Sequence, residues 1–434
     1  MDFKRDENKL NKGEIAVGFD LTDNYSQISY GFLEDNAEVE TLSYVADAAS
    51  YQIPTLLFKR REVNQWYAGY DAVKNSNQDG ILVDRILTRA RTEEMITVGD
   101  DSFRPASLIA LFMKRTLALL NSVSPIGKIA SFMVTVDTLD DKMVSVLQDA
   151  VGMLGLKTEN IYFQSHMESF YFYTIFQPKE LWNHEVLLLD FSGQNLQSYR
   201  MECNKYTTPV VAFIDPCSYS GFSFDNINDV SPDSAEAHDL DTQLGGIIAD
   251  ITENRLFSSI YFIGENFNKD IFRESLKQMA RRGRLFEGNN LYSKGAAFAA
   301  RNKVIKSILS ENHVFLGNDK LKSNIGINVL KQGQNAYLAL MDAGVNWFEA
   351  GRECDIILNQ GNKLTFVITP LTGKNPELVD ITLGDLPKRP PKTTRLHLSV
   401  KMMSENKMQV KVQDMGFGEL FPACNVEWNE VINV

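Results

Sequence analysis

Aspartates that directly follow apolar strands are the residues of this chain whose type and position best suit chemistry. Asp20 follows the run EIAVGF, Asp190 follows EVLLL, and each begins a polar turn. A strand, a carboxylate and a tight turn are the parts with which many proteins hold a nucleotide phosphate. A third apolar run, IYFI, ends at Gly264 and Glu265. The two strand–carboxylate–turn units are typical of strand ends that bind phosphate.

The turns after the two aspartates lack most of the glycines that such a site needs. A backbone that approaches a phosphate closely favours glycine, but the first turn has Thr22 and Asp23. The second turn keeps Gly193 between Ser192 and Gln194. Asp23 would also place a carboxylate near a polyphosphate, and like charges repel without a compensating cation. The turns therefore predict that phosphate binding is weakened or lost.

Two hydrophobic patterns divide the chain into domains. Residues 13–322 alternate strands with amphipathic helices, as in the apolar strand 129–136, which predicts an α/β domain. From 323 to 434 the apolar residues alternate with period two between Gly, Asn and Pro turns, which predicts an all-β module. Residues 1–12 are polar and charged, and we expect a disordered tail there.

The segment between the second and third strand ends is the least regular part of the first domain. Residues 225–241 are acidic and rich in small side chains, which predicts a loop, and a helix is expected over 242–256. Asn266 is placed to cap a helix over residues 271–279.

Composition argues against two classes of partner. The 434 residues carry a formal charge of −12, so we expect neither nucleic acid nor an anionic membrane as a partner. The four cysteines lie far apart without CxxC spacing, which is typical of a reduced cytoplasmic protein. No stretch reaches the apolar length of a membrane span, and the first residues lack the apolar segment of a secretory signal. A cytoplasmic location is therefore expected.

The order of these motifs resembles that of Hsp70 (DnaK-type) chaperones, within the actin/Hsp70/sugar-kinase ATPase superfamily. The stretch VGFDLTDNYSQISY resembles the first phosphate loop of that family, VLLLDFSGQNLQ the second, and IYFIGENFNKDIFRESLKQM the adenosine loop. The stretch LHLSVKMMSENKMQVKVQD is similar to part of the peptide-binding sandwich. The resemblance implies a two-lobed, actin-like ATPase fold over 13–322 and an Hsp70-like substrate-binding β-sandwich over 323–434.

The resemblance assigns site residues only in a degenerate form. Remnant catalytic positions would be Asp20, Glu168, Asp190 and Arg85, and the nucleotide loops would contain Thr22, Asp23, Gly193, Gly264 and Glu265. Asp20 is equally compatible with a turn, and Glu168 with capping or pairing in the core. The interval from Asp190 to Gly264 is far shorter than in Hsp70, which implies that the adenine-side lobe is shortened or missing. The five histidines lack metal or nucleophile spacing and are expected at the surface or in the core.

Two main functional hypotheses follow. The first is a non-catalytic, Hsp70-like protein that binds a polypeptide or protein partner through the β-sandwich and needs no cofactor. The alternative is a divergent ATP-binding chaperone that uses Mg²⁺ with Asp20, Asp190 and Glu168. An actin-type assembly protein is a third possibility that the C-terminal sandwich disfavours. We expect no helical lid over the sandwich, so bound peptide would exchange fast.

Overall fold

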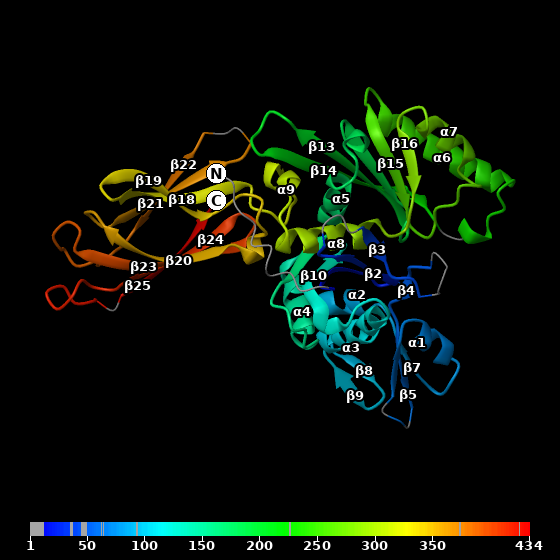
Figure 1. Ribbon diagram of the computed structural model, residues 1–434, viewed down its shortest axis with the longest axis horizontal. Helices are drawn as coiled ribbons and strands as arrows, with labels where there is room; N and C mark the ends of the chain where they lie inside the picture. The colour runs from blue at the N-terminus through cyan, green and yellow to red at the C-terminus, as the bar shows by residue number, and fades with distance from the viewer. Residues whose placement is uncertain are drawn as a thin grey trace. The chain divides into compact units, whose positions relative to one another are not determined.

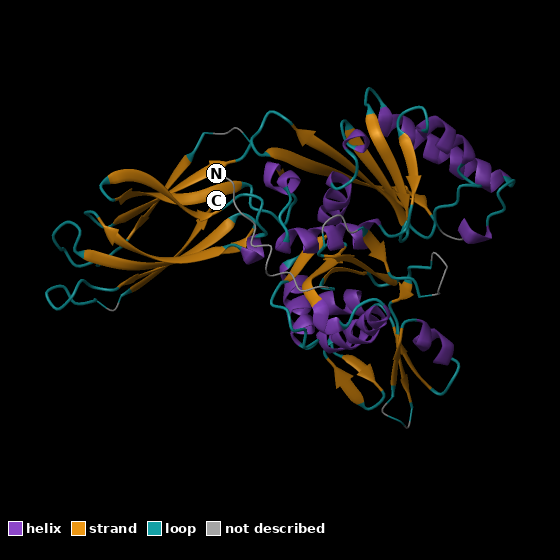
Figure 2. Cartoon of the chain, in the orientation of Figure 1, coloured by secondary structure: helices purple, strands orange, loops and turns teal. Residues whose placement is uncertain are grey.

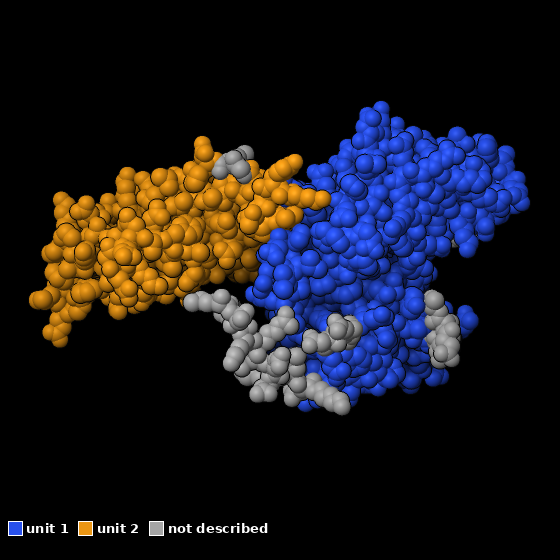
Figure 3. All heavy atoms as spheres, turned by 45° about the horizontal axis from the view of Figure 1, so that its top comes forward, with its two compact units in different colours: residues 1–204, 212–313 blue, residues 205–211, 314–434 orange. Residues whose placement is uncertain are grey.

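The computed structural model describes residues 13–34, 38–44, 50–61, 63, 65–92, 94–224, 227–372, 375–424 and 426–434. The expected disordered tail at 1–12 lies outside the described residues. The chain forms two compact units, which Figure 3 colours separately. Unit 1 comprises Met1–Asn204 and Ala212–His313, and unit 2 comprises Lys205–Val211 and Val314–Val434. The main division therefore lies at 313/314, a few residues before the expected 322/323.

Unit 1 contains two sheets with the same topology (Figure 1). The first has the order β11-β10-β1-β2-β3, and the second contains β16-β15-β12-β13-β14 in that order. In each, a central strand pairs antiparallel with the strand that follows it and parallel with a later one. The central strands are β1 (Ile15–Leu21) and β12 (Glu185–Asp190). This duplication places Asp20 and Asp190 at equivalent strand ends.

The remaining strands of unit 1 have the following bounds. The first sheet also contains β2 (Tyr25–Phe32), β3 (Val39–Thr41), β4 (Ile53–Pro54), β10 (Ile129–Val136) and β11 (Ile161–Ser165). The second also contains β13 (Asn195–Asn204), β14 (Val210–Ser223), β15 (Phe257–Ile263) and β16 (Arg284–Glu287), and the short strand β17 (His313–Phe315) lies at the division of the chain into units. Smaller sheets contain β5 (Leu57–Arg60), β6 (Trp66–Ala68), β7 (Gly80–Val83), β8 (Ile96–Val98) and β9 (Asp101–Phe103). Every residue of β1 is buried, as expected for a strand in the interior of a sheet with both faces covered.

Helices cover both sheets of unit 1. They are α1 (Tyr70–Asn75), α2 (Ile86–Arg91), α3 (Pro105–Leu117), α4 (Asp141–Gly152), α5 (His166–Ile175), α6 (Ala235–Thr252), α7 (Arg273–Met279), α8 (Leu291–Val304) and α9 (Ile308–Asn312). The expected loop over 225–241 is wrong from residue 235 onward, because the Ser234 side chain accepts from the Ala237 amide and begins α6 there. Asn266 does not cap α7; its side-chain amide donates to the backbone oxygens of Phe191 and Gly193.

Small residues let α8 lie unusually close to its neighbours. A Cβ added to Gly295 would overlap the carbonyl of Ser169 in α5, and one added to Gly18 in β1 would overlap the backbone of α8 at Ala297. Figure 1 shows α8 between the two sheets of unit 1. Close backbone approach at these glycines therefore determines where α8 lies relative to β1 and α5.

Unit 2 contains two four-stranded sheets around one hydrophobic core (Figure 2). The first sheet, in the order β19-β18-β21-β22, contains β18 (Ser323–Lys331), β19 (Gln334–Met341), β21 (Lys363–Pro370) and β22 (Glu377–Thr382). The second, in the order β20-β23-β24-β25, contains β20 (Gly351–Leu358), β23 (Thr394–Ser404), β24 (Lys407–Asp414) and β25 (Glu427–Asn433). Burial alternates along β23 and β24, as the period-two pattern predicts.

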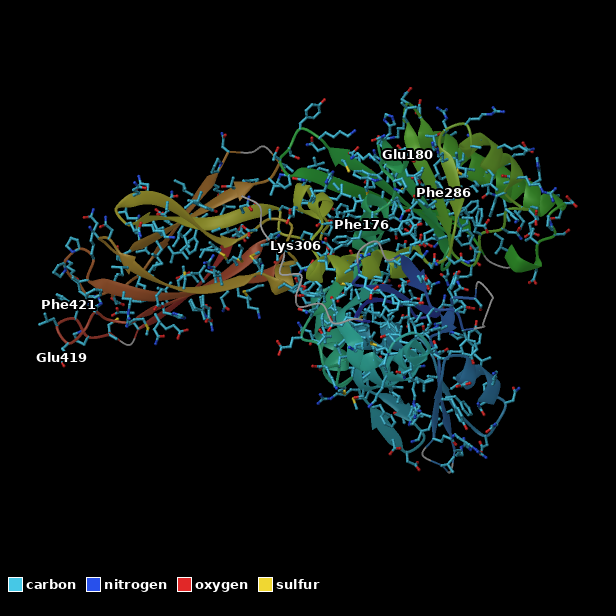
Figure 4. The ribbon with its side chains drawn as sticks, viewed as in Figure 1. Phe176, Glu180, Phe286, Lys306, Glu419 and Phe421 are labelled. Atoms are coloured by element: carbon cyan, nitrogen blue, oxygen red, sulfur yellow. The ribbon has the colours of Figure 1, made fainter. Side chains whose placement is uncertain are left out.

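A buried ion pair closes the loop that follows β24. Asp414 accepts two hydrogen bonds from the Arg389 guanidinium, at 2.8 and 2.6 Å, and one each from the amides of Gly416 and Cys424. Burial alone would raise the pKa of Asp414, but these hydrogen bonds outweigh it and hold the pKa well below its ordinary value. Figure 4 labels Glu419 and Phe421 on this loop.

Two glycine-to-alanine substitutions test the close packing of α8. Gly295→Ala should lower the free energy of unfolding by about 3 kcal/mol, the upper end of overpacking costs, because α8 and α5 must separate. Gly246→Ala in α6 is the matched control: nothing lies near its added Cβ, so better helix propensity should stabilise the protein by up to about 1 kcal/mol. Urea unfolding measures both. Equal effects of the two substitutions would contradict the inferred packing.

Candidate functional site

The ends of β1, β12 and β15 surround a cavity of about 490 Å³ in unit 1. Its lining includes Asp20, Asp190 and Gly264, one residue at or just after the end of each strand. The duplicated topology produces this arrangement, because the two central strands bring equivalent aspartates to one place. The cavity is the candidate functional site.

Four side chains form a continuous series at this cavity. The Nε2 atom of His166 lies 2.8 Å from Oδ1 of Asp20. The His166 ring stacks on Tyr292, with centroids 3.9 Å apart and an angle of 10° between the planes. The Tyr292 hydroxyl donates to Oδ2 of Asp190 at 2.8 Å, and the Ser192 amide donates to Oδ1 at 2.8 Å. The series Asp20–His166–Tyr292–Asp190 thus joins the two aspartates through the protein's own side chains.

Local structure positions the middle members of this series. Ser165 ends β11, and its side chain accepts from the Glu168 amide to begin α5, so His166 is the first helical residue. Tyr292 lies in the first turn of α8, whose approach to β1 and α5 is fixed by the glycines described above. Both rings are buried.

Burial and neighbouring carboxylates shift the acid–base properties of this series. Burial lowers the pKa of the His166 imidazole, but the Asp20 carboxylate, with Asp137 and Asp190, outweighs this effect and the pKa is raised above its ordinary value. Burial raises the pKa of Asp190, although hydrogen bonds from Ser192 and Tyr292 oppose the shift. Burial also raises the pKa of Tyr292 well above 10. The arrangement favours a protonated His166 beside Asp20.

The first turn uses its polar side chains within the protein. Asp23 accepts from the amides of Leu87 and Thr88 at 2.8 and 3.1 Å and from the Thr88 hydroxyl at 2.6 Å, at the start of α2. The Thr22 hydroxyl donates to the backbone oxygen of Tyr25 at 2.6 Å and accepts from its amide at 3.2 Å. Asp23 therefore satisfies the amino end of a helix, a role that the sequence did not suggest.

The second and third turns pack directly against each other. Gly264 has a φ of 103°, and a Cβ there would overlap the backbone of Phe191 and Ser192. Asn266 ties the same two turns together, as described above. Glycine is therefore required at position 264 for backbone packing, whatever else binds in the cavity.

The cavity is rich in carboxylates. Asp20, Asp23, Asp137, Asp190 and Glu265 line it. Arg91 is the one arginine or lysine among the described lining residues, and it is already bound to Asp137 at 2.7 Å and to Asp140 at 3.0 Å. A polyphosphate would meet net negative charge here without a free arginine or lysine.

Most of the expected site residues line the same cavity. Those that line the cavity are Asp20, Thr22, Asp23, Asp190, Gly193, Gly264 and Glu265. Arg85, an exposed residue with a φ of 50° before α2, and Glu168, buried in α5, are outside this lining set. Within the described part of the chain, no group of three or more His, Cys, Asp or Glu side chains is arranged to hold a metal ion.

His166, Tyr292 and Arg91 belong to the site but were not among the expected residues. Expecting His166 only as a surface or core residue overlooked its contact with Asp20. One available signal was its position directly after the strand over 161–165, since a polar residue at that edge of a parallel sheet lies near the other strand ends.

Comparisons with known proteins identify families but no established activity. Residues 38–318 match a family described as "Family of unknown function (DUF5716) C-terminal". The chain belongs to this family. Residues 320–434 match a second domain of unknown function, DUF8552, and no curated protein matches the chain. In the described residues, none of the helices has the length and apolar character needed to cross a membrane.

The His166–Asp20 pair should make stability depend on pH. Because the folded-state pKa of His166 is raised, its contribution is fully present below the unfolded-state pKa of about 6.5 and is lost as pH rises through the folded-state value. His166→Gln should remove this part of the pH profile and cost about 3 kcal/mol at pH 6, since it removes one partner of a buried pair. Urea unfolding between pH 5.5 and 8.5 measures both effects.

His238→Gln, at an exposed position on α6, is the control and should leave the pH profile unchanged. A wild-type profile that stays flat, or rises, above pH 6.5 would contradict the charged pair.

Proposed function

We propose that this chain is a non-catalytic, Hsp70-like protein that binds a polypeptide or protein partner through unit 2. One observation carries the proposal: the series Asp20–His166–Tyr292–Asp190 occupies the carboxylates that a Mg²⁺–nucleotide complex would need. In this proposal unit 1 is an actin/Hsp70-type fold in which internal side-chain contacts replace the contacts to a nucleotide.

The engagement of the two aspartates supports the loss of nucleotide binding. Asp190 accepts a hydrogen bond on each carboxylate oxygen, and Asp20 is paired with the buried His166. Separating a buried charge from its partner costs about 3–5 kcal/mol. A metal ion that bound Asp20 would have to compensate the free energy lost on separating Asp20 from His166. The acidic lining would still repel the phosphates.

The architecture of unit 1 supports the fold part of the proposal. Two sheets of equal topology with aspartates at equivalent ends are consistent with the two-lobed superfamily. Between Asp190 and Gly264, the described residues form strands β13, β14 and β15, a short 3-10 helix and the single α-helix α6. This supports a shortened adenine-side lobe.

Unit 2 supports polypeptide binding because it leaves large apolar side chains in solvent. Leu378 and Leu420 are 65% and 86% exposed. The four cysteines are free thiols, which supports the proposed cytoplasmic location.

Titration with Mg²⁺–ATP tests the loss of nucleotide binding. Isothermal titration of the full chain should give no saturable heat up to about 1 mM ATP, where binding free energy would be only about −4 kcal/mol. An active Hsp70 chaperone in the same buffer is the positive control. Micromolar binding by this chain would contradict the proposal.

Polypeptide binding should also be independent of nucleotide. Fluorescence anisotropy with a library of labelled, extended peptides should find binders whose affinity is the same within twofold with and without 1 mM Mg²⁺–ATP. This is expected because no nucleotide is bound to alter unit 2. A tenfold change on adding ATP would favour the alternative of a divergent ATP-dependent chaperone.

A further inference from the structure

Strand β22 (Glu377–Thr382) is an edge strand with one open side. It is the last strand in the order β19-β18-β21-β22 and pairs with β21. In an antiparallel pair, alternate residues direct their N–H and C=O groups away from the partner strand. Among the residues that the structure describes, none outside β21 hydrogen-bonds to the backbone of β22. Its outer side therefore offers unpaired backbone groups.

Lysine, proline and a β-bulge, three features that protect many edge strands, are missing from β22. Its sequence, ELVDIT, contains neither Lys nor Pro, and its pairing with β21 continues without a register shift. The opposite edge of the sheet is different. There β18 and β19 pair with a register shift, and the Arg352 side chain donates to the backbone oxygen of Ala339 in β19. Of the two edges of this sheet, β22 is the one open to an added strand.

Leu378 forms a small apolar patch beside this edge, because it pairs in register with Val367. Val367 lines a cavity of about 430 Å³ whose other lining residues are Tyr337, Thr369, Asn324 and Asp342. The two edge strands of the other sheet, β20 and β25, lack such a patch, because the exposed Ile357 lies beside Arg395 and the exposed Val431 lies beside Gln409. An added strand at β22 would cover Leu378, and a long apolar side chain on it would reach toward Val367.

The charges of β22 identify the chemistry of an added strand. Glu377 and Asp380 are exposed, and Asp380 lies on the same face as Leu378, two residues further along. Lys363 approaches Asp380 only to 3.7 Å, with both side chains about half exposed, so solvent screens this pair. Two copies of β22 side by side would bring like charges together. A basic peptide complements this edge better than a second copy does.

We propose that β22 binds an extended polypeptide as an additional strand of the first sheet of unit 2. An apolar residue of the peptide lies beside Leu378, and a lysine or arginine two positions away lies beside Asp380. Backbone hydrogen bonds supply affinity, and the two side-chain positions supply specificity. This inference rests on the proposed polypeptide-binding function and assigns it a surface.

The test uses the full chain and a fluorescein-labelled nonapeptide in which valine and threonine alternate, beginning and ending with valine. The valine at position 7, two positions after the central valine, is replaced by lysine. Leu378→Lys should weaken binding at least tenfold, because a lysine protects an open edge. Leu330→Lys is the matched control, an exposed leucine of the same sheet on the interior strand β18, and should change affinity less than twofold. Thermal unfolding and circular dichroism verify that both variants fold.

A charge exchange tests the second position. Asp380→Lys should weaken binding of the lysine peptide about tenfold and strengthen binding of the same peptide with glutamate in place of lysine by a similar factor. A simple loss of folding would weaken both peptides, so the reversal separates recognition from damage to the sheet.

Other outcomes would overturn the inference in distinguishable ways. If library peptides bind but Leu378→Lys and Asp380→Lys have no effect, the edge is not the site, while polypeptide binding elsewhere stands. If no library peptide binds the wild-type chain, the proposed function fails as well. If Leu378→Lys only converts a dimer to a monomer in sedimentation experiments, β22 pairs with a second copy of the chain.

Discussion

The approach of α8 to β1 and α5 is the constraint on which the candidate site depends. Gly18 and Gly295 remove the side chains that would hold α8 away from these elements. Only at this separation does Tyr292, in the first turn of α8, lie flat against His166 and reach Asp190. The site is thus positioned by backbone packing in the core, and its polar contacts follow from that packing.

The same geometry gives carboxylates of the cavity hydrogen-bond partners within the protein. Burying carboxylates is unfavourable unless they are paired or hydrogen-bonded. Asp20 is paired with His166, Asp190 accepts from Tyr292 and Ser192, and Asp23 accepts from α2. In a nucleotide-binding protein a bound cation would meet part of this demand. Here helix ends and side chains of the protein itself meet it.

Local sequence predicted the parts of the site that depend on local structure. Asp20, Asp190 and Gly264 could be placed because each ends or follows a buried apolar strand, and the ends of such strands meet in a parallel sheet. His166 could not be assigned its role, since this depends on Tyr292, which is distant in sequence and was not among the expected site residues. The start of α6 was missed because acidic, small residues suggested a loop, although Ser234 supplies a helix cap.

The two units differ in where their polar groups find partners. In unit 1 the strand ends, the places where this kind of sheet usually meets a ligand, are occupied by internal hydrogen bonds. In unit 2 the core is closed as well, but β22 has backbone groups on one side that no other described residue reaches. Water satisfies such groups in the free protein, and an extended chain satisfies them equally well while also covering Leu378. Unit 2 can therefore bind an extended chain through backbone hydrogen bonds at β22. This binding does not require a ligand in the cavity of unit 1.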